Sequence, residues 1–257
     1  MALNVQGGPP DRTFGEIPMY KAIRFVIKGV VPTIMHNGQT SDPLNRYAKE
    51  MKKLTSKKTK TDDDHLAVAK VEWFAALYVD DKNRPCWPGE NIESMIVAAA
   101  RKTKLGIQAK SAIIVDGNIP LDYEGPKNAE KLWSYKPFDK NPFISRVPVV
   151  VNRSRVMRTR PIFTDWSLTF TVHYLPNMLT EDNVIEFIET AGTTIGLSDW
   201  RPKYGRFHVM SKDILTGSRS REETKQESAE EGVTVEDPLP QTAELNVATV
   251  ETAAVSQ

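Results

Sequence analysis

Residues 194–209, with Gly192 just before them, interleave glycines, cations and aromatic side chains in a way that a plain connecting loop does not require. The glycines allow positive φ angles or a close approach of the backbone to a ligand. The cations can reach phosphate groups, and the flat rings can stack on bases. The residues concerned are Gly192, Gly196, Gly205, Arg201, Lys203, Arg206, Trp200, Tyr204 and Phe207. The alternative is a tight helix-to-strand connection whose rings fill the core, and for Phe207 and Trp166 we favour that core position.

Two further segments concentrate positive charge. Between residues 46 and 60 seven cations accompany a single acid, Glu50, and between 153 and 160 four arginines occur without an acid. If the second segment is extended, Arg153 and Arg155 share one face and Arg158 and Arg160 the other. We predict that both segments bear phosphates, although a lysine run is also typical of a solvated face. The predicted contacts are Lys52, Lys53, Lys57, Lys58, Arg153, Arg155, Arg158 and Arg160.

Two residues near the first predicted strand are candidates for acid–base catalysis. His36 follows that strand, and Asp42 lies in the polar stretch after it, where Tyr47 or Lys53 could assist proton transfer. A lone histidine at a turn is more often an ordinary loop residue. Four scattered histidines and one cysteine have no metal-ligand spacing, so we expect no metal and no cofactor. The acids at 62–64 suit a helix N-terminus better than a metal site.

The charge is distributed unevenly along the 257 residues. Residues 218–257 contain nine acids and three bases, whereas 1–217 have seven more bases than acids. A basic body favours a polyanionic partner, and an acidic tail can compete for the basic face or recruit a protein partner. Low aromatic content and high acidity predict a disordered tail over 218–257. Residues 1–18 are predicted to be a flexible arm.

Composition also indicates the compartment. A single cysteine excludes an intramolecular disulfide and fits a reducing cytoplasm. Residues 1–18 lack the pattern of a secretory signal, and no apolar run is long enough to span a membrane. We therefore expect a cytoplasmic protein without a membrane partner. No Gly-x-x-x-x-Gly-Lys-Ser/Thr loop is present, which argues against nucleotide hydrolysis.

Apolar periodicity predicts a single α+β domain over 19–217. Strands are expected at 19–31, 113–123, 147–151, 164–173 and 206–210, and the hairpin signal Asp116-Gly117-Asn118 divides the second of these. Helices are expected at 44–54, 62–79, 91–104 and 180–191, the last with Thr180 as N-cap and Gly192 as stop. The order of the core elements predicts a ferredoxin-like (RRM-like) βαββαβ unit with large insertions, one of them the basic segment 36–61.

Three local features of this chain resemble the RAMP superfamily, whose RRM-like members are the RNA-binding backbone and processing subunits of CRISPR effector complexes. The first strand leads into a long basic insertion. Residues 87–96, Trp-Pro-Gly-Glu-Asn-Ile-Glu-Ser-Met-Ile, are similar to the opening of that family's first helix, and residues 191–207 are similar to its glycine-rich loop. The chain departs from the pattern where Glu90, Asn91 and Glu93 replace small and basic residues. The separate acidic tail is closer to a stand-alone, phage-encoded relative.

Three functions are consistent with these features. The first is a binding protein for single-stranded RNA or DNA that grips the sugar–phosphate backbone and assembles as a homo-oligomer along the strand. The second is a metal-independent endoribonuclease like the processing members of the family that the chain resembles. The third is a structural or inhibitory protein that imitates an effector subunit and uses its basic patches to contact protein.

Overall fold

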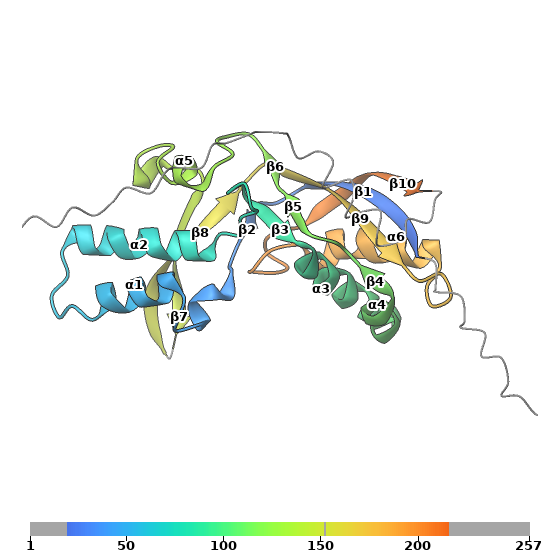
Figure 1. Cartoon of the computed structure of the whole chain (residues 1–257), viewed down its shortest axis with the longest axis horizontal. Coiled ribbons are helices and arrows are strands. Elements are labelled where there is room, and N and C mark those ends of the chain that lie inside the picture. The colour runs from blue at the N-terminus through green and yellow to red at the C-terminus, as the bar shows by residue number, and fades with distance from the viewer. Residues whose placement is uncertain (1–19, 152, 216–257) are drawn as a thin grey trace, which may run out of the picture. The chain divides into compact units, whose positions relative to one another are not determined.

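The computed structural model describes residues 20–151 and 153–215. They form an α+β fold with antiparallel sheets and six α-helices (Figure 1). The predicted arm 1–18 and the predicted acidic tail 218–257 lie outside the described residues. Within the described ranges, no helix is both long enough and apolar enough to cross a membrane.

The main sheet is built from strands whose side chains alternate between apolar and polar. Its strands are β1 (Lys21–Gly29), β4 (Ile113–Ile114), β6 (Asp122–Tyr123), β9 (Trp166–Tyr174) and β10 (Phe207–Leu215). They run in the order β10-β1-β9-β4 with every neighbour antiparallel, and β6 also pairs with β9. The register places Phe25 opposite Phe170, with the two rings stacked 5.9 Å apart. Because alternate residues face the same side, one face of this sheet is apolar.

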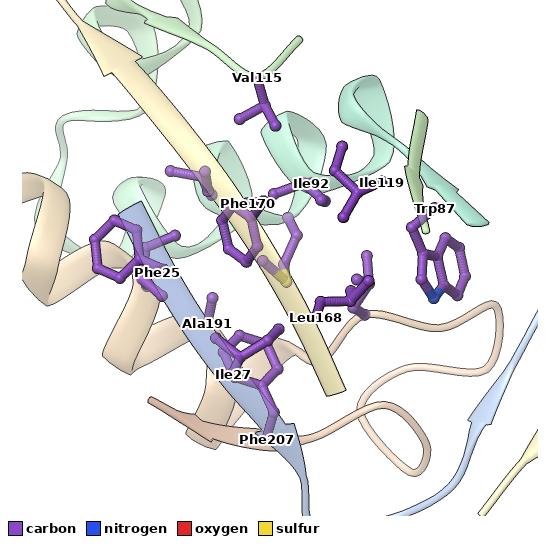
Figure 2. Packing of buried hydrophobic residues seen from close by; sticks show 14 of the residues in the cluster. Phe25, Ile27, Trp87, Ile92, Val115, Ile119, Leu168, Phe170, Ala191 and Phe207 are labelled. Atoms are coloured by element: carbon purple, nitrogen blue, oxygen red, sulfur yellow. The ribbon is translucent and has the colours of Figure 1, made fainter. Parts of the chain in front are cut away.

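Three helices supply the side chains that bury this face: α3 (Gly89–Ala100), α4 (Gly106–Ala112) and α6 (Glu181–Thr190). Figure 2 shows Ile92 of α3 and Ala191, directly after α6, in one cluster with Phe25 and Phe170. On the opposite face of β1, Arg24 is exposed. The predicted N-cap of α6 is confirmed, since the Thr180 side chain accepts a hydrogen bond from the Asn183 amide. We call this sheet and its helices the sheet unit.

A second group of elements contains α1 (Arg46–Thr55), α2 (Asp62–Ala76), β7 (Ile144–Val151) and β8 (Ser154–Phe163). From here on we call this group the arm, as distinct from the predicted N-terminal segment 1–18. The strands β7 and β8 form an antiparallel hairpin, and β2 (Thr33–Ile34) pairs with the end of β8. Helix α2 packs against α1 and against β8 (Figure 1). Buried Trp73 of α2 donates its indole N–H to the Phe143 carbonyl at 2.9 Å. Helix α1 has no buried residue.

Short elements complete the two groups or lie between them in the chain. They are β3 (Cys86–Pro88), β5 (Asn118–Pro120), α5 (Ala129–Trp133), η1 (Gly38–Ser41), η2 (Arg101–Thr103), η3 (Phe138–Lys140) and η4 (Ala191–Ile195). Cys86 is a buried free thiol, and this burial raises its pKa to about 12. A thiol with so high a pKa is unreactive near neutral pH.

Three local predictions are wrong. The signal Asp116-Gly117-Asn118 does not close a hairpin, because β4 pairs with β9 and β5 with β3. Gly192 does not stop the helix, since the chain continues as η4 until Gly196 takes a φ of 83°. Arg153 lies in the β7–β8 turn at a φ of 65°, so it does not share a strand face with Arg155. The prediction that the acids at 62–64 lie at a helix N-terminus is confirmed, since all three are in the first turn of α2; the N-cap itself is Thr61, in a capping box with Asp64.

Candidate nucleic-acid interface

Two cavities have His36 in common. The first, of about 460 Å³, lies between α2 and β8, and we call it the arm cavity; its polar walls include Glu72, Arg158 and Arg160. The second, of about 220 Å³, lies between the start of α3 and the loop before β10, and we call it the loop cavity. Its polar walls are His36, Asn91, Ser94, Ser198, Asp199 and Arg201. Together they form what we call the His36 cleft.

The strap that carries His36, residues 32–37, is held on both sides by hydrogen bonds. Thr33 donates its hydroxyl to the Leu197 carbonyl at 2.6 Å, and Ile34 donates its amide to the Ser198 hydroxyl at 3.0 Å. On the other side the Met35 amide bonds the Pro161 carbonyl at 3.1 Å. The strap therefore links the loop before β10 to β8 and fixes where His36 stands.

Arg158 and Arg160 project from the same side of β8, because they are two residues apart on a strand. This agrees with the expectation that the two share one face if the segment is extended. Arg158 contacts Glu72 of α2 at 2.5 Å, and Glu72 also accepts the Thr159 amide at 2.9 Å. Arg160 forms an ion pair with Asp199. Each arginine thus joins β8 to another element and is partly neutralised. A guanidinium carries five N–H donors, so each retains donors for a ligand.

The electrostatic environment of His36 favours the neutral imidazole. Burial lowers the pKa of His36 from its ordinary value of 6.5, Arg160 and Arg158 lower it further, and Asp199 raises it. A neutral imidazole can accept a proton or a hydrogen bond at pH 7. His36 is therefore a chemically competent group in the middle of the cleft, which its position at a turn alone did not indicate.

The glycine-containing loop before β10 has the backbone geometry that its sequence predicts. Gly196 and Gly205 take φ angles of 83° and 79°. The Leu197 amide bonds the Gly205 carbonyl at 2.8 Å, and a Cβ on Gly205 would lie 2.3 Å from the Leu197 carbonyl oxygen. No larger side chain fits there without moving the backbone. The loop closes on itself and presents residues 198–204 beside the strap.

The aromatic residues of this loop divide into two kinds. Trp200 and Tyr204 contact each other with ring centroids 5.8 Å apart, and Lys203 lies 5.0 Å from the Trp200 ring. Trp200 is 44% exposed, so its ring is accessible for stacking. Phe207 is buried beside Trp166, which confirms the core position for both.

Helix α1 borders the arm cavity through Met51. The next two residues, Lys52 and Lys53, are exposed in the last turn of this helix. Lys57 is paired with Asp64 at 2.5 Å, whereas Lys58 is exposed in the connection to α2. Of the predicted lysine contacts to phosphate, Lys57 is therefore already paired with an acidic side chain.

Several predicted residues stand apart from the cleft lining. Arg153 and Arg155 are exposed at the turn end of the β7–β8 hairpin. The side chain of Arg206 is exposed, and its carbonyl accepts the Val30 amide at 2.8 Å. Asp42 accepts the Leu44 amide at 2.8 Å, which gives it the ordinary role of a turn residue. The structure thus brings together His36, Arg158, Arg160 and Arg201, with the α1 lysines at the border.

The cleft also contains residues that the sequence did not single out as ligand contacts. Glu72, Asp199, Asn91 and Ser94 line it, and nothing in their local sequence marks them as site residues. Asn91 was noted only as a departure from a family pattern. Another such departure, Glu93, has a structural role, because its carboxylate accepts the Val115 amide at 2.8 Å. Over 20–151 and 153–215, no group of three or more His, Cys, Asp or Glu side chains could hold a metal ion.

Similarity of this chain to known proteins is found in structure and not in sequence. No protein-family model matches the sequence, and no curated protein matches it. Among solved structures, the chain is similar to a chain of a type III-B Cmr-β complex bound to cognate target RNA, with 11% sequence identity and a TM-score of 0.39. The match covers 77% of this chain and 61% of that chain, so this chain spans less than two thirds of its neighbour. A likeness at this level assigns no function.

Proposed function

We propose that this protein binds single-stranded nucleic acid and grips the sugar–phosphate backbone in the His36 cleft. The observation that carries the proposal is the convergence of Arg158 and Arg160 from β8, Arg201 from the loop, and His36 from the strap. Arginines from two separate segments around one concave surface, with a neutral imidazole between them, suit a polyanionic chain better than a small neutral ligand. The exposed lysines at the end of α1 extend the positive charge along one border.

The exposed ring of Trp200 supports a strand in preference to an isolated phosphate. A base can stack on its face, and stacking of this kind contributes about 1–3 kcal/mol per base regardless of sequence. The cation of Lys203 already lies against the same ring, so a phosphate next to a stacked base would meet a positive charge. The predicted contacts at Arg153, Arg155, Arg206 and Lys58 belong to this proposal as outlying phosphate contacts.

The proposal includes a relationship to RAMP proteins and a ferredoxin-like core. Support for the core comes from the strand order β10-β1-β9-β4, with α3 between β1 and β4 and α6 between β9 and β10. That order is the one a βαββαβ unit requires when both helices cover one face. Assembly of copies along a strand and a protein partner for the acidic tail stay predictions.

Fluorescence anisotropy of the full chain with labelled 30-nucleotide U RNA and dT DNA, over a salt series, tests the proposal. Replacing Arg201 by Gln removes one cleft cation. The negative slope of log K against log[salt] is therefore expected to become shallower by about 0.7. Arg101→Gln is the matched control, because Arg101 is an exposed arginine at the opposite end of α3. Comparison of the affinities for the RNA and for the DNA shows which sugar is preferred.

Binding no tighter than to heparin, and unchanged by Arg201→Gln, would refute strand binding. That result would favour the structural or inhibitory protein whose basic patches contact another protein. Equal losses for Arg201→Gln and Arg101→Gln would show that charge matters without a defined site.

A second candidate function, metal-independent RNA cleavage, is favoured by one specific observation. His36 lies in the cleft beside Arg160 and Arg158, and its lowered pKa keeps it available as a general base. In such a reaction the 2′-hydroxyl gives its proton to His36 and its oxygen forms a bond to phosphorus. The bond from phosphorus to the 5′-oxygen breaks, and that oxygen takes a proton from water.

Incubation of end-labelled RNA with the full chain in EDTA tests this second candidate. Cleavage predicts a 2′,3′-cyclic phosphate product from RNA and no product from DNA. The product should disappear in His36→Gln and persist in Asp42→Asn, because Asp42 caps a turn and does not line the cleft. Intact RNA after long incubation, or cleavage that survives His36→Gln, would exclude this mechanism.

A further inference from the structure

We propose that the loop cavity binds one unstacked guanine base of the bound strand, an inference that rests on the proposed strand-binding function. The cavity of about 220 Å³ is smaller than the roughly 300–1,000 Å³ of pockets for drug-sized ligands. It therefore suits a group of the size of a single base. It opens beside the strap and the loop that present His36 and Arg201, so a strand in the cleft passes its entrance.

A buried donor without a partner lies in the wall of this cavity. Trp87 is 3% exposed, and its indole N–H has no hydrogen-bond partner among the described residues. Its ring contacts Tyr78 at 5.6 Å, and Figure 2 shows it at the edge of the hydrophobic cluster. Buried donors are nearly always paired, because an unpaired one carries the full desolvation penalty. The indole N–H is thus a covered donor next to the cavity whose acceptor the described residues do not supply.

The remaining groups define which ligand fits. Arg201 is a multiple donor that can bond the O6 and N7 acceptors of guanine in the bidentate manner common at specific sites. Asp199 is an acceptor: Arg160 contacts its Oδ2, and no hydrogen bond to Oδ1 is present in the described parts of the chain. A carboxylate oxygen complements the N1–H and N2–H donors of guanine. Asn91 and Ser94, one turn apart on α3, add an amide and a hydroxyl.

The same groups discriminate against other bases. Adenine presents an N1 acceptor where guanine has a donor, so the Asp199 carboxylate would face a lone pair. Adenine also carries an amino donor in place of O6, which would face the Arg201 guanidinium. Pyrimidines have no N7 and cannot fill the bidentate contact. Unpaired and repulsive contacts of this kind give specificity against the wrong ligand.

The test compares affinities of the full chain for three labelled 30-nucleotide RNAs: all U, U with four isolated guanines, and U with adenines at the same positions. Guanine RNA is expected to bind about tenfold more tightly than adenine RNA, as one good bidentate pair provides. Inosine, which lacks the N2 amino group, should give an intermediate affinity. In Asp199→Asn the guanine-to-adenine ratio should fall, because the N1–H and N2–H donors lose their carboxylate acceptor, and the preference that remains is the share of the Arg201 contact. Asp165→Asn, which removes an acid from an exposed ion pair with Lys28, should keep the wild-type ratio.

The ratio of two affinities on one variant is the readout, so a general change in binding or stability cancels. Equal affinity of the wild type for guanine and adenine RNA would overturn the guanine site and leave strand binding intact. A guanine preference that Asp199→Asn leaves unchanged would overturn it as well. Absence of binding to all three RNAs would remove the proposed function, and the guanine site with it.

Discussion

The sheet unit and the arm are stabilised by different interactions. In the sheet unit, apolar side chains of β1 and β9 lie opposite one another and are covered by α3 and α6. In the arm, α1 buries no residue, and β8 is tied to α2 by Glu72, which bonds both the Arg158 side chain and the Thr159 amide. The sheet unit is held by packing, whereas the arm combines packing of buried side chains such as Trp73 and Phe163 with these individual polar contacts.

This difference explains where the candidate site lies. Burial of apolar area stabilises the sheet unit without constraining the exact position of any polar group. The polar contacts of the arm and of the strap, by contrast, fix the positions of His36, Arg158 and Arg160. A cleft bordered by arginines therefore forms at the junction, where directional bonds hold these polar groups in place.

The largest effect is expected from a cavity in the sheet unit. Phe170→Ala removes a buried ring that stacks on Phe25, and large-to-small changes of this kind cost about 3–5 kcal/mol. Leu44→Ala, at a side chain that is 76% exposed before α1, should change stability by less than about 0.5 kcal/mol. Urea unfolding measures both. Similar losses for the two variants would contradict the contrast between packed sheet and exposed arm.

A smaller but more local effect is expected from Glu72→Ala. The change leaves the Thr159 amide and Arg158 without their acceptor, which should cost about 1–3 kcal/mol. Glu72→Gln is the control, because its amide oxygen still accepts one N–H. Hydrogen exchange should accelerate in β8 and stay unchanged in β9. Equal acceleration in both strands would show that arm and sheet unit do not respond separately.

The capping box of α2 should contribute about 1 kcal/mol. Thr61→Ala removes the side chain that accepts the Asp64 amide, and loss of such an N-cap typically costs about 0.5–2 kcal/mol. Thr59→Ala, two residues earlier and exposed, is the matched control and should be nearly neutral. Thermal unfolding of the two variants checks the difference. A larger loss for Thr59→Ala would place the helix start elsewhere.

The smallest effect concerns pH. Because folding lowers the pKa of His36 below 6.5, the unfolded chain binds more protons at this position at mildly acidic pH. The stability that a neutral His36 contributes is therefore present above pH 6.5 and is lost as the pH falls from 6.5 through the folded pKa. The wild type should lose more stability than His36→Gln in this window, as measured by urea unfolding at pH 7.5 and at lower values. Parallel curves for the two proteins would contradict the lowering of the His36 pKa by its surroundings in the cleft.

The sequence by itself determined the elements whose signals are local. Alternation along residues 166–173 fixed a strand with one buried face, and Thr180 fixed the start of α6. The glycines at 196 and 205 indicated the two positive φ angles of the loop. Such signals can be read because each depends on neighbours within a few residues, through side-chain periodicity or a bond to a nearby amide.

Only the tertiary structure decided which polar groups meet. Glu72 and Arg158 are 86 residues apart, and Ile34 and Ser198 are 164 apart, yet hydrogen bonds join each pair. No local pattern reports such a partner, because the encounter depends on how the strands are ordered and on the path of the strap. The sequence therefore predicted the arginines as a class, whereas the fold selected Arg158, Arg160 and Arg201 for the cleft and placed His36 among them.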